Sequence, residues 1–565
     1  MAHTLTNRRR VLIALLVLAL PAMTAAFVAL HPFDDDEFQH AHYAWLLHHG
    51  QRPFRDFFEH HLPAYHLLAA PVYTAVEAPE SLFALRGVSW ACLLAALACV
   101  YGASRALCSG PAGPIAALLL LSSAPIFLTK MLEARPEAPA VLCFAAALRL
   151  LFARRRDGDP RAPVRLALAG LLAGAMPAFS HKFGLSAAAL LAGAFLLVGA
   201  RRGLLFMAAS VLPISAVLAW AATQGILGDL YRNVFVLGVE WKHRFSPSGY
   251  LTALWSDSAL LVTAGLAGLL LMAGEPARAR RQAAVLFMAL AAGTATLFLV
   301  PEPYRQSFLP LFPLLAIGAA VTADRAWRSI LRATAPPTDG AAVEPSPQDD
   351  ATRPIRFPGA VAAALLVLAA AALYPSAISL AADLKQSPSA DLRRMRAADA
   401  TGSPRYFDGR GLLFYRPHTG RHACMHQGIQ AMLDPAGFSA ESIAALRASG
   451  FPTVILDYRV LQMPAEIVSF IREHYLPVGD DVFVPGFRID RSRLVGRPCR
   501  VQVPVEGLYN MSWRGGKVQC DGRAVTSGAA VPLAAGEHVL EGAGFVEGFA
   551  AILVRRTEAG RGILP

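Results

Sequence analysis

Long apolar runs divide this chain, and they constrain its fold more than any other feature. The first run, Val11 to Leu30, is twenty residues without a charge. A helix needs about 20 mainly apolar residues to cross a bilayer, and only helices and closed barrels satisfy their backbone hydrogen bonds in hydrocarbon. Charged residues make up 16% of the chain, against about 25% in soluble domains. We therefore predict a polytopic α-helical membrane protein.

Eleven apolar segments are long enough to be spanning helices. They are 11–31, 81–106, 112–129, 137–153, 164–180, 183–200, 203–224, 258–273, 283–300, 306–323 and 357–378. The first follows Arg8 to Arg10, as the core of a signal peptide would. A signal core is about 7–15 residues long, and this run is longer and is followed by many more. We predict that it is kept as the first span.

Arginine residues occur in short blocks between the apolar runs, and the net charge is +12. Basic blocks alternate with acidic or weakly charged loops, which is the positive-inside pattern of membrane proteins. The pattern argues against a nucleic-acid partner. It places the N-terminus in the cytoplasm and the C-terminus on the outer side of the membrane. The external segments are then 32–80, 130–136, 181–182, 225–257 and 301–305.

The last third of the chain has a different composition. Residues 1–378 form the predicted membrane domain, which includes a cytoplasmic linker at 335–356 that is rich in Pro, Asp, Ala and Thr. Residues 379–490 combine a buried-strand pattern with two amphipathic helical patterns, which predicts an external α/β subdomain. Residues 491–565 contain short alternating segments between Gly-rich turns, which is typical of an antiparallel β-sandwich-like module.

Three cysteines lie in this C-terminal part. We expect Cys499 and Cys520 on neighbouring strands of the β module, where an exported location permits a disulfide. Cys424 would then be left unpaired. None of the seven cysteines in the chain has the spacing of a zinc site.

The segment from Phe33 to Pro63 concentrates ionisable side chains directly after the first run. It contains four consecutive carboxylates, Asp34 to Glu37, six histidines and Glu59. Charges beside hydrocarbon are costly, so such a cluster indicates a functional site. Further charges are predicted on the same face of the membrane. They belong to Lys130 to Glu137, His181-Lys182 and Glu302 to Gln306.

Acids and bases that converge on one face suit a reaction between an anionic lipid head group and a neutral nucleophile. A carboxylate can accept a proton from a hydroxyl, and arginine or lysine can hold a phosphate and stabilise departing charge. Simpler interpretations stay open. The carboxylates could be solvated surface, Lys182 and Arg305 could be interfacial anchors, and Arg135-Pro136-Glu137 could merely begin a helix. The histidines match no standard metal-ligand spacing, so no metal ligand is assigned.

Together these elements resemble the GT-C glycosyltransferases of bacterial membranes, which are related to protein O-mannosyltransferases and lipid A aminoarabinose transferases. The resemblance covers roughly residues 8–325. Its most specific part is the loop after the first span. The matching residues are the pair Asp36-Glu37, Gly50 to Asp56, Phe57 to Pro63, Arg135-Pro136-Glu137, Lys182 and Tyr304-Arg305.

The resemblance implies an inverting enzyme that transfers a hexose or pentose from a polyprenyl-phosphate donor, without a nucleotide sugar. The acceptor would be a lipid, glycan or protein. Asp36 would be the general base, with Glu37 or Glu59 orienting the base or the acceptor. Because the acidic run is Asp-Asp-Asp-Glu, Asp34 and Asp35 remain alternatives for the base.

The same resemblance implies that Lys182 and Arg305 bind the donor phosphate, with Arg135 as a further candidate. No cofactor is required by the motifs, and a divalent cation stays an open alternative. We expect Asp36, Lys182 and Arg305 to meet in one outward-facing pocket.

Two other classes of function compete with this one. A transporter or flippase for lipid-linked saccharides would show ionisable residues or broken helices near the membrane midplane. The predicted spans are instead nearly free of charge at their centres. A carbohydrate- or partner-binding C-terminal domain on a membrane anchor is the third class, and eleven spans are more than an anchor needs.

Overall fold

The computed structural model describes residues 21–153, 159–237, 247–299, 304–333, 382, 388–490, 497–503, 506–513, 515–545 and 549–555. The linker 335–356 and the last predicted span, 357–378, lie outside the described residues. Of the first predicted span, 11–31, the structure describes a helix at Pro21–Leu30.

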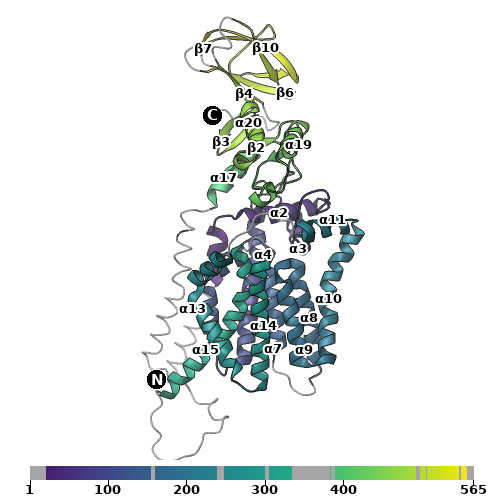
Figure 1. Cartoon of the computed structure of the whole chain (residues 1–565). Coiled ribbons are helices and arrows are strands. Elements are labelled where there is room, and N and C mark those ends of the chain that lie inside the picture. Colours follow the sequence, from purple (N-terminus) through teal and green to yellow (C-terminus); the bar gives the residue numbers. More distant parts are fainter. Residues whose placement is uncertain are drawn as a thin grey trace, which may run out of the picture.

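A bundle of long helices forms the membrane domain (Figure 1). Six helical stretches of the described chain are long and apolar enough to cross a bilayer. They are α4 (Ser81–Leu107), α8 (Ala162–Phe179), η2 with α9 (His181–Phe183 and Gly184–Val198), α10 (Ala200–Thr223), α13 (Pro247–Ala273) and α14 (Ala277–Leu299). The polytopic helical fold is therefore confirmed.

Two further helices of the bundle match predicted spans, although they fall outside those six. They are α7 (Glu137–Phe152), which has 16 residues, and α15 (Leu311–Ala333), whose second half is charged. The total of eleven spans stays a prediction.

The predicted span 112–129 is not continuous, which corrects the sequence analysis. It consists of α5 (Ala112–Ser122) and α6 (Pro125–Leu132), whose axes differ by 74°. Ala124 is extended, with φ −83° and ψ 106°. Proline disfavours the helical conformation of the residue before it, so Pro125 explains the break. The break turns α6 in a new direction and brings its C-terminal end to the candidate site described below.

Small residues allow the helices to approach closely. A Cβ atom added to Gly268 of α13 would lie 1.8 Å from the carbonyl oxygen of Gly318 in α15. A Cβ atom on Gly174 of α8 would lie equally close to the carbonyl oxygen of Ser210 in α10. Close backbone contact of this kind is how helices associate in lipid, where burial of apolar side chains gives little advantage.

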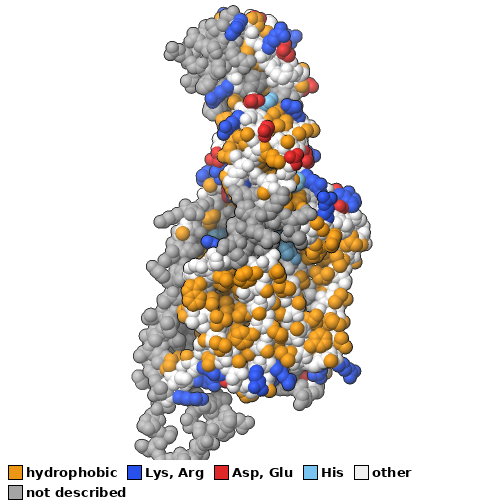
Figure 2. All heavy atoms as spheres, viewed as in Figure 1, with side chains coloured by type: hydrophobic (Ala, Val, Ile, Leu, Met, Phe, Trp, Pro, Cys, Tyr) orange, Lys and Arg blue, Asp and Glu red, His pale blue; other side chains and the backbone are white. Residues whose placement is uncertain are grey.

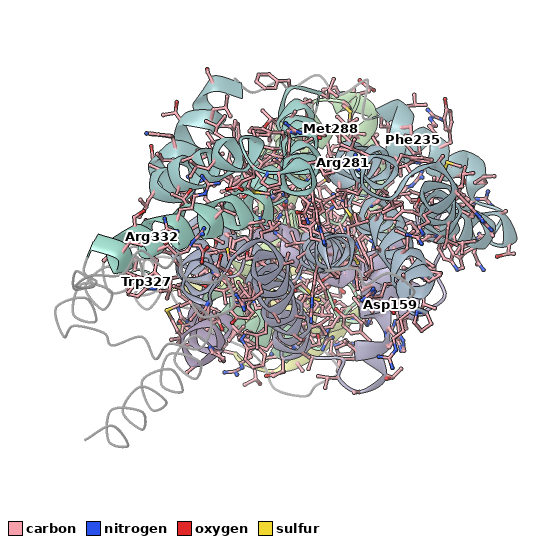
Figure 3. The ribbon with its side chains drawn as sticks, turned by 90° about the horizontal axis from the view of Figure 1, so that it is seen from below. Asp159, Phe235, Arg281, Met288, Trp327 and Arg332 are labelled. Carbon is pink, nitrogen blue, oxygen red and sulfur yellow. The ribbon has the colours of Figure 1, made fainter. Side chains whose placement is uncertain are left out.

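The surface of the bundle is consistent with a lipid environment. Hydrophobic side chains cover the face shown in Figure 2, and Lys and Arg side chains gather along its lower edge. Leu260 and Leu270 of α13 are 64% and 66% exposed. Figure 3 looks onto the basic end of the bundle, where Asp159, Arg281 and Arg332 are labelled. This is a multi-pass membrane protein, and its orientation stays a prediction.

Short helices cross the opposite end of the bundle, and the C-terminal part lies above them (Figure 1). The crossing elements are α2 (Asp35–His48), α3 (Ala64–Ala69), η1 (Ala70–Thr74) and α11 (Leu227–Tyr231). The helices above them are α17 (Ser389–Ala400), α18 (Gln427–Gln430), α19 (Pro435–Ala448) and α20 (Ala465–His474). Of the predicted external loop 225–257, residues 238–246 lie outside the description.

Two sheets complete the C-terminal part. The larger has the order β1-β2-β4-β11-β6-β9, with β3 also paired to β4, and the smaller has the order β5-β10-β7-β8. The strands of the larger sheet are β1 (Tyr406–Phe407), β2 (Thr453–Ile455), β3 (Tyr475–Gly479), β4 (Val482–Asp490), β6 (Gly507–Ser512), β9 (Ala530–Leu533) and β11 (Phe549–Arg555). Those of the smaller are β5 (Cys499–Val503), β7 (Gly515–Cys520), β8 (Arg523–Val525) and β10 (Gly536–Phe545). Through β4, one sheet joins the α/β part to the β part.

The expectation that Cys499 and Cys520 lie on neighbouring strands, where a disulfide could form, is wrong. Leu540 of β10 pairs with Cys499 on one side and with Cys520 on the other, so β10 lies between the two cysteine strands. Strands are about 4.8 Å apart, and two such steps exceed the roughly 7 Å that a disulfide allows between Cα atoms. Both thiols are free and buried.

Candidate active site

A cavity of about 480 Å³ lies where distant parts of the chain meet. These parts are the start of α2, the end of α6 with the turn after it, the start of α13, the segment before α15, and the C-terminal α/β part. The lining residues are Phe33, Asp34, Asp35, Asp36, Lys130, Arg135, Tyr250, Tyr304, Arg305, Gln306, His426 and Arg459.

The acidic run is the first turn of α2. Asp34 is the N-cap: its side chain accepts a hydrogen bond from the Asp36 N–H, and Glu37 accepts one from the Asp34 N–H. This is a capping box, and carboxylates are favourable at the positive end of a helix dipole. The local sequence therefore begins a helix at this point and directs successive aspartates to different sides.

Arg135 binds two of the three aspartates. Its Nη2 donates to Asp34 Oδ1 at 2.6 Å and to Asp36 Oδ2 at 2.7 Å, and it also contacts Glu133. Burial raises the pKa of Asp36, but the combined attraction of Arg135, Arg459 and Lys130 outweighs it, and the net pKa lies below the ordinary value. The Asp36 side chain is 33% exposed. It is therefore an ionised carboxylate that solvent and substrate can reach.

Asp35 faces the C-terminal part instead. Arg410 Nε lies 2.6 Å from Asp35 Oδ1, Arg459 Nη2 lies 2.9 Å from Oδ2, and the hydroxyl of Tyr458 also donates to Oδ2. These bonds join α2 to the soluble part of the chain. Asp35 has three strong donors, so it is poorly suited to accept a further proton.

Glu37 does not line the cavity. It is fully buried and forms an ion pair with Arg86 of α4, with Nη2 to Oε2 at 2.6 Å and Nε to Oε1 at 2.8 Å. It also accepts the N–H of Ala134 at 2.8 Å. Glu37 ties α2 to the bundle and does not meet a substrate in this arrangement.

Arg305 presents a cation to the cavity. It begins the short helix η4 (Arg305–Phe308) and is exposed. Within the described residues it forms no ion pair, whereas Lys130, Arg135 and Arg459 each contact a carboxylate. The neighbouring Tyr304 hydroxyl lies 2.7 Å from His426 Nε2 of the C-terminal part. Arg305 is thus placed where it can bind an anion that enters the cavity.

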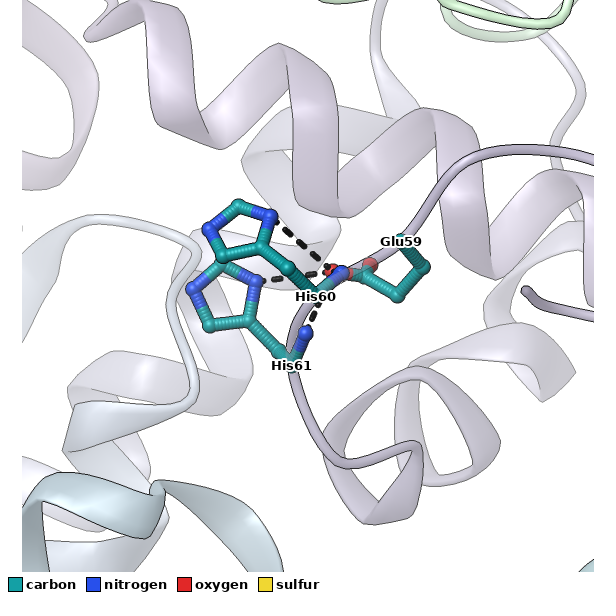
Figure 4. Close-up of side chains that lie close together, drawn as sticks. All are labelled: Glu59, His60 and His61. Atoms are coloured by element: carbon teal, nitrogen blue, oxygen red, sulfur yellow. Dashed lines mark hydrogen bonds and ion pairs between the residues drawn. The ribbon is translucent and has the colours of Figure 1, made fainter. Parts of the chain in front are cut away.

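Lys182 and Glu59 lie outside the cavity lining. Lys182 Nζ is 3.0 Å from Glu137 Oε1. Glu59 accepts the N–H groups of His60 and His61 at 2.7 and 2.8 Å, as well as a bond from the His61 ring (Figure 4). Both belong to a buried cluster beside the cavity. The expectation that Asp36, Lys182 and Arg305 line one pocket therefore holds for Asp36 and Arg305 and not for Lys182.

Sequence reasoning missed several residues of the site. Lys130 was visible as a charge in an external turn, and its Nζ lies 3.0 Å from Asp34 Oδ2. Arg410, His426, Tyr458 and Arg459 had no detectable signal. They lie more than 350 residues beyond α2 in the sequence. The fold brings His426 and Arg459 to the cavity lining and Arg410 and Tyr458 to the side chain of Asp35.

Known structures share this arrangement of the chain. The crystal structure of ArnT from Cupriavidus metallidurans bound to undecaprenyl phosphate is similar with a TM-score of 0.50 and 13% identity, over 86% of this chain and 92% of that chain. The apo structure of the same ArnT is similar with a TM-score of 0.50 and 14% identity, over 74% of this chain and 86% of that chain. The oligosaccharyltransferase AglB from Archaeoglobus fulgidus has a TM-score of 0.46 and 12% identity to this chain, over 92% of this chain and 74% of that chain. No protein-family model and no curated protein sequence matches.

The fold is therefore that of the GT-C glycosyltransferases, which confirms the fold that the sequence resemblance implied. At 13% and 14% identity the likeness concerns the fold, and the activity is argued below from the site.

Proposed function

We propose that this protein is an inverting glycosyltransferase that uses a polyprenyl-phosphate sugar at the outer face of the bacterial inner membrane. The observation that carries the proposal is the cavity in which the ionised Asp36 lies together with Arg305, which forms no ion pair with any residue that the structure describes. A transferase of this kind needs a proton acceptor and a phosphate-binding cation in the same space. The fold supports it, since its ArnT neighbour was crystallised with undecaprenyl phosphate.

The reaction is a single displacement at the anomeric carbon. The acceptor oxygen attacks from the face opposite the phosphate, the bond from the anomeric carbon to the phosphate oxygen breaks, and the acceptor proton passes to Asp36. Polyprenyl phosphate leaves with the electron pair, and Arg305 stabilises its charge. Nearby carboxylates favour the positive charge that develops on the sugar ring, as in glycoside hydrolysis.

Arg135 contributes by holding the base. A depressed pKa makes Asp36 a weak base, but it also keeps the residue ionised at neutral pH, which is the form that can accept a proton. Because its guanidinium already bonds two aspartates, Arg135 acts as a positioning residue and not as a donor-phosphate ligand. Glu37 acts indirectly through α2. We assign no direct contact with donor or acceptor to Lys182 or Glu59.

The alternative is a transporter or flippase for lipid-linked saccharides. One observation favours it, the break between α5 and α6, because transporters use broken helices. However, α6 carries Lys130 to the cavity, where its Nζ contacts Asp34. The break therefore has a role in building the polar site at the end of the bundle.

A transfer assay separates these functions. The purified full-length protein is placed in vesicles with a polyprenyl phosphate that carries a radiolabelled sugar, and acceptors are supplied as separate lipid, glycan and protein fractions of a bacterial envelope. Label covalently joined to one fraction supports the proposal and identifies the acceptor class. Movement of intact donor across the bilayer without transfer would indicate a transporter. Retention of donor with neither outcome would indicate a binding protein.

A further inference from the structure

Histidine side chains surround Glu59 beside the cavity. One comes from α2, two from the loop that follows it, one from α3 and one from η2. They are His40, His60, His61, His66 and His181. The rings of His60 and His61 have centroids 4.0 Å apart, and Figure 4 shows both rings on the same side of the Glu59 carboxylate. His66 and Glu59 are 1% and 0% exposed.

The ligand atoms in this cluster are close enough to share one ion. Glu59, His60 and His61 each offer an atom, and these three atoms lie within 4.8 Å of one another. His66 Nε2 lies 3.5 Å from Glu59 Oε2 and 3.1 Å from His40 Nδ1. One carboxylate and three imidazoles within this space match the four-ligand sets of zinc sites.

The positions of the rings fit one shared ion, because they gather around a single buried carboxylate. The ring centroid of His40 lies 5.0 Å from that of His61 and 5.3 Å from that of His66, so the imidazoles face one common space. Imidazole nitrogens and a carboxylate oxygen are ordinary ligands of transition metals.

We propose that Glu59, His60, His61 and His66 bind one divalent transition-metal ion, for which Zn²⁺ is the best match. Imidazole with carboxylate suits Zn²⁺ well, whereas Mg²⁺ and Ca²⁺ prefer oxygen ligands throughout. The ion would join the loop after α2 to α3 and so hold the wall beside Asp36 in place. The proposal concerns metal binding and does not rest on the transferase activity.

The test is the metal content of the purified full-length protein. After dialysis against metal-free buffer, elemental analysis should give about one zinc per chain. His61→Ala with His66→Ala should lower this several-fold. His48→Ala with His49→Ala is the matched control, because these rings lie near Glu77, away from the cluster; it should leave the content unchanged.

A second measurement does not depend on any variant. The wild-type protein stripped by a chelator is titrated with Co²⁺, and imidazole–carboxylate ligation should produce visible absorption bands that saturate at one equivalent and disappear when Zn²⁺ is added. The proposal is overturned if the wild type holds no stoichiometric zinc and no Co²⁺ bands appear. It is equally overturned if the double variant of His61 and His66 keeps full metal content, since the ion would then lie elsewhere.

Discussion

At the scale of the residue, the three aspartates of the acidic run differ by their partners. Asp34 caps α2 and meets Lys130, Asp35 binds two arginines of the C-terminal part, and Asp36 bonds Arg135 while facing the cavity. The sequence left the choice of base open among the three. The contacts favour Asp36, which contacts one cation and is 33% exposed.

Replacing Asp36 should therefore remove the reaction and leave the fold intact. We expect Asp36→Asn to lower kcat by about 10²–10⁴, the usual effect of losing a general base, while donor binding changes little. The measurement is sugar transfer together with binding of the labelled donor. Asp56→Asn, in an exposed pair with Arg52 in the same loop, is the control. Full activity of Asp36→Asn would exclude it as the base.

Replacing Arg305 should weaken use of the donor. A charge-assisted bond to phosphate is worth about 1.5–3 kcal/mol, so Arg305→Ala should lower kcat/KM for the donor by roughly tenfold to a hundredfold. Arg305→Lys should recover part of the loss, because it restores the charge without the planar fork. Unchanged donor affinity and rate in Arg305→Ala would show that the phosphate binds elsewhere.

At the scale of the element, α2 depends on Glu37. This one side chain completes the capping box, pairs with Arg86 and accepts the N–H of Ala134. The sequence marked Glu37 as half of an acidic motif, and that motif suggested contact with substrate. Its burial could not be read from the motif, because it depends on Arg86, which is 49 residues away in another helix.

Removing Glu37 should destabilise the protein. In Glu37→Ala the guanidinium of Arg86 stays buried without its partner, which typically costs about 3–5 kcal/mol. We expect a clearly lower midpoint in thermal unfolding of the detergent-solubilised protein. Glu80→Ala, at an exposed residue before α4, should change stability by less than about 0.5 kcal/mol. Equal midpoints for the two variants would contradict the structural role of Glu37.

At the scale of the whole molecule, the site exists only where the C-terminal part meets the bundle. Arg410 and Arg459 hold Asp35, and His426 contacts Tyr304. Arg410→Ala should loosen this contact while both parts stay folded. Hydrogen exchange should become faster in α2 and in residues 406–416. Arg405→Ala, at an exposed residue of the same part, should leave exchange at the wild-type rate, and an identical pattern for both variants would argue against the contact.

The contact should also weaken in mild acid. His422 packs against Phe58, with ring centroids 5.2 Å apart, and burial, with Arg421 and His418 nearby, lowers its pKa to about 4. The unfolded chain binds this proton near pH 6.5, so between pH 6.5 and 4 the unfolded state holds more protons and stability falls as the pH falls. The loss is at most about 3 kcal/mol. Unfolding midpoints from pH 7 to 4 should decline less steeply in His422→Gln, and parallel curves would contradict the assignment.

The sequence by itself determined that this is a multi-pass helical protein, where its polar segments lie, and which motifs to compare with a known fold. Those properties depend on the length and charge of local runs, which lipid and water act on directly. Tertiary structure decided that Asp36 and Arg305 share a cavity, that Glu37 is buried, and that Cys499 and Cys520 are separated by a strand. Each depends on contacts between distant residues, and local patterning carries no record of such contacts.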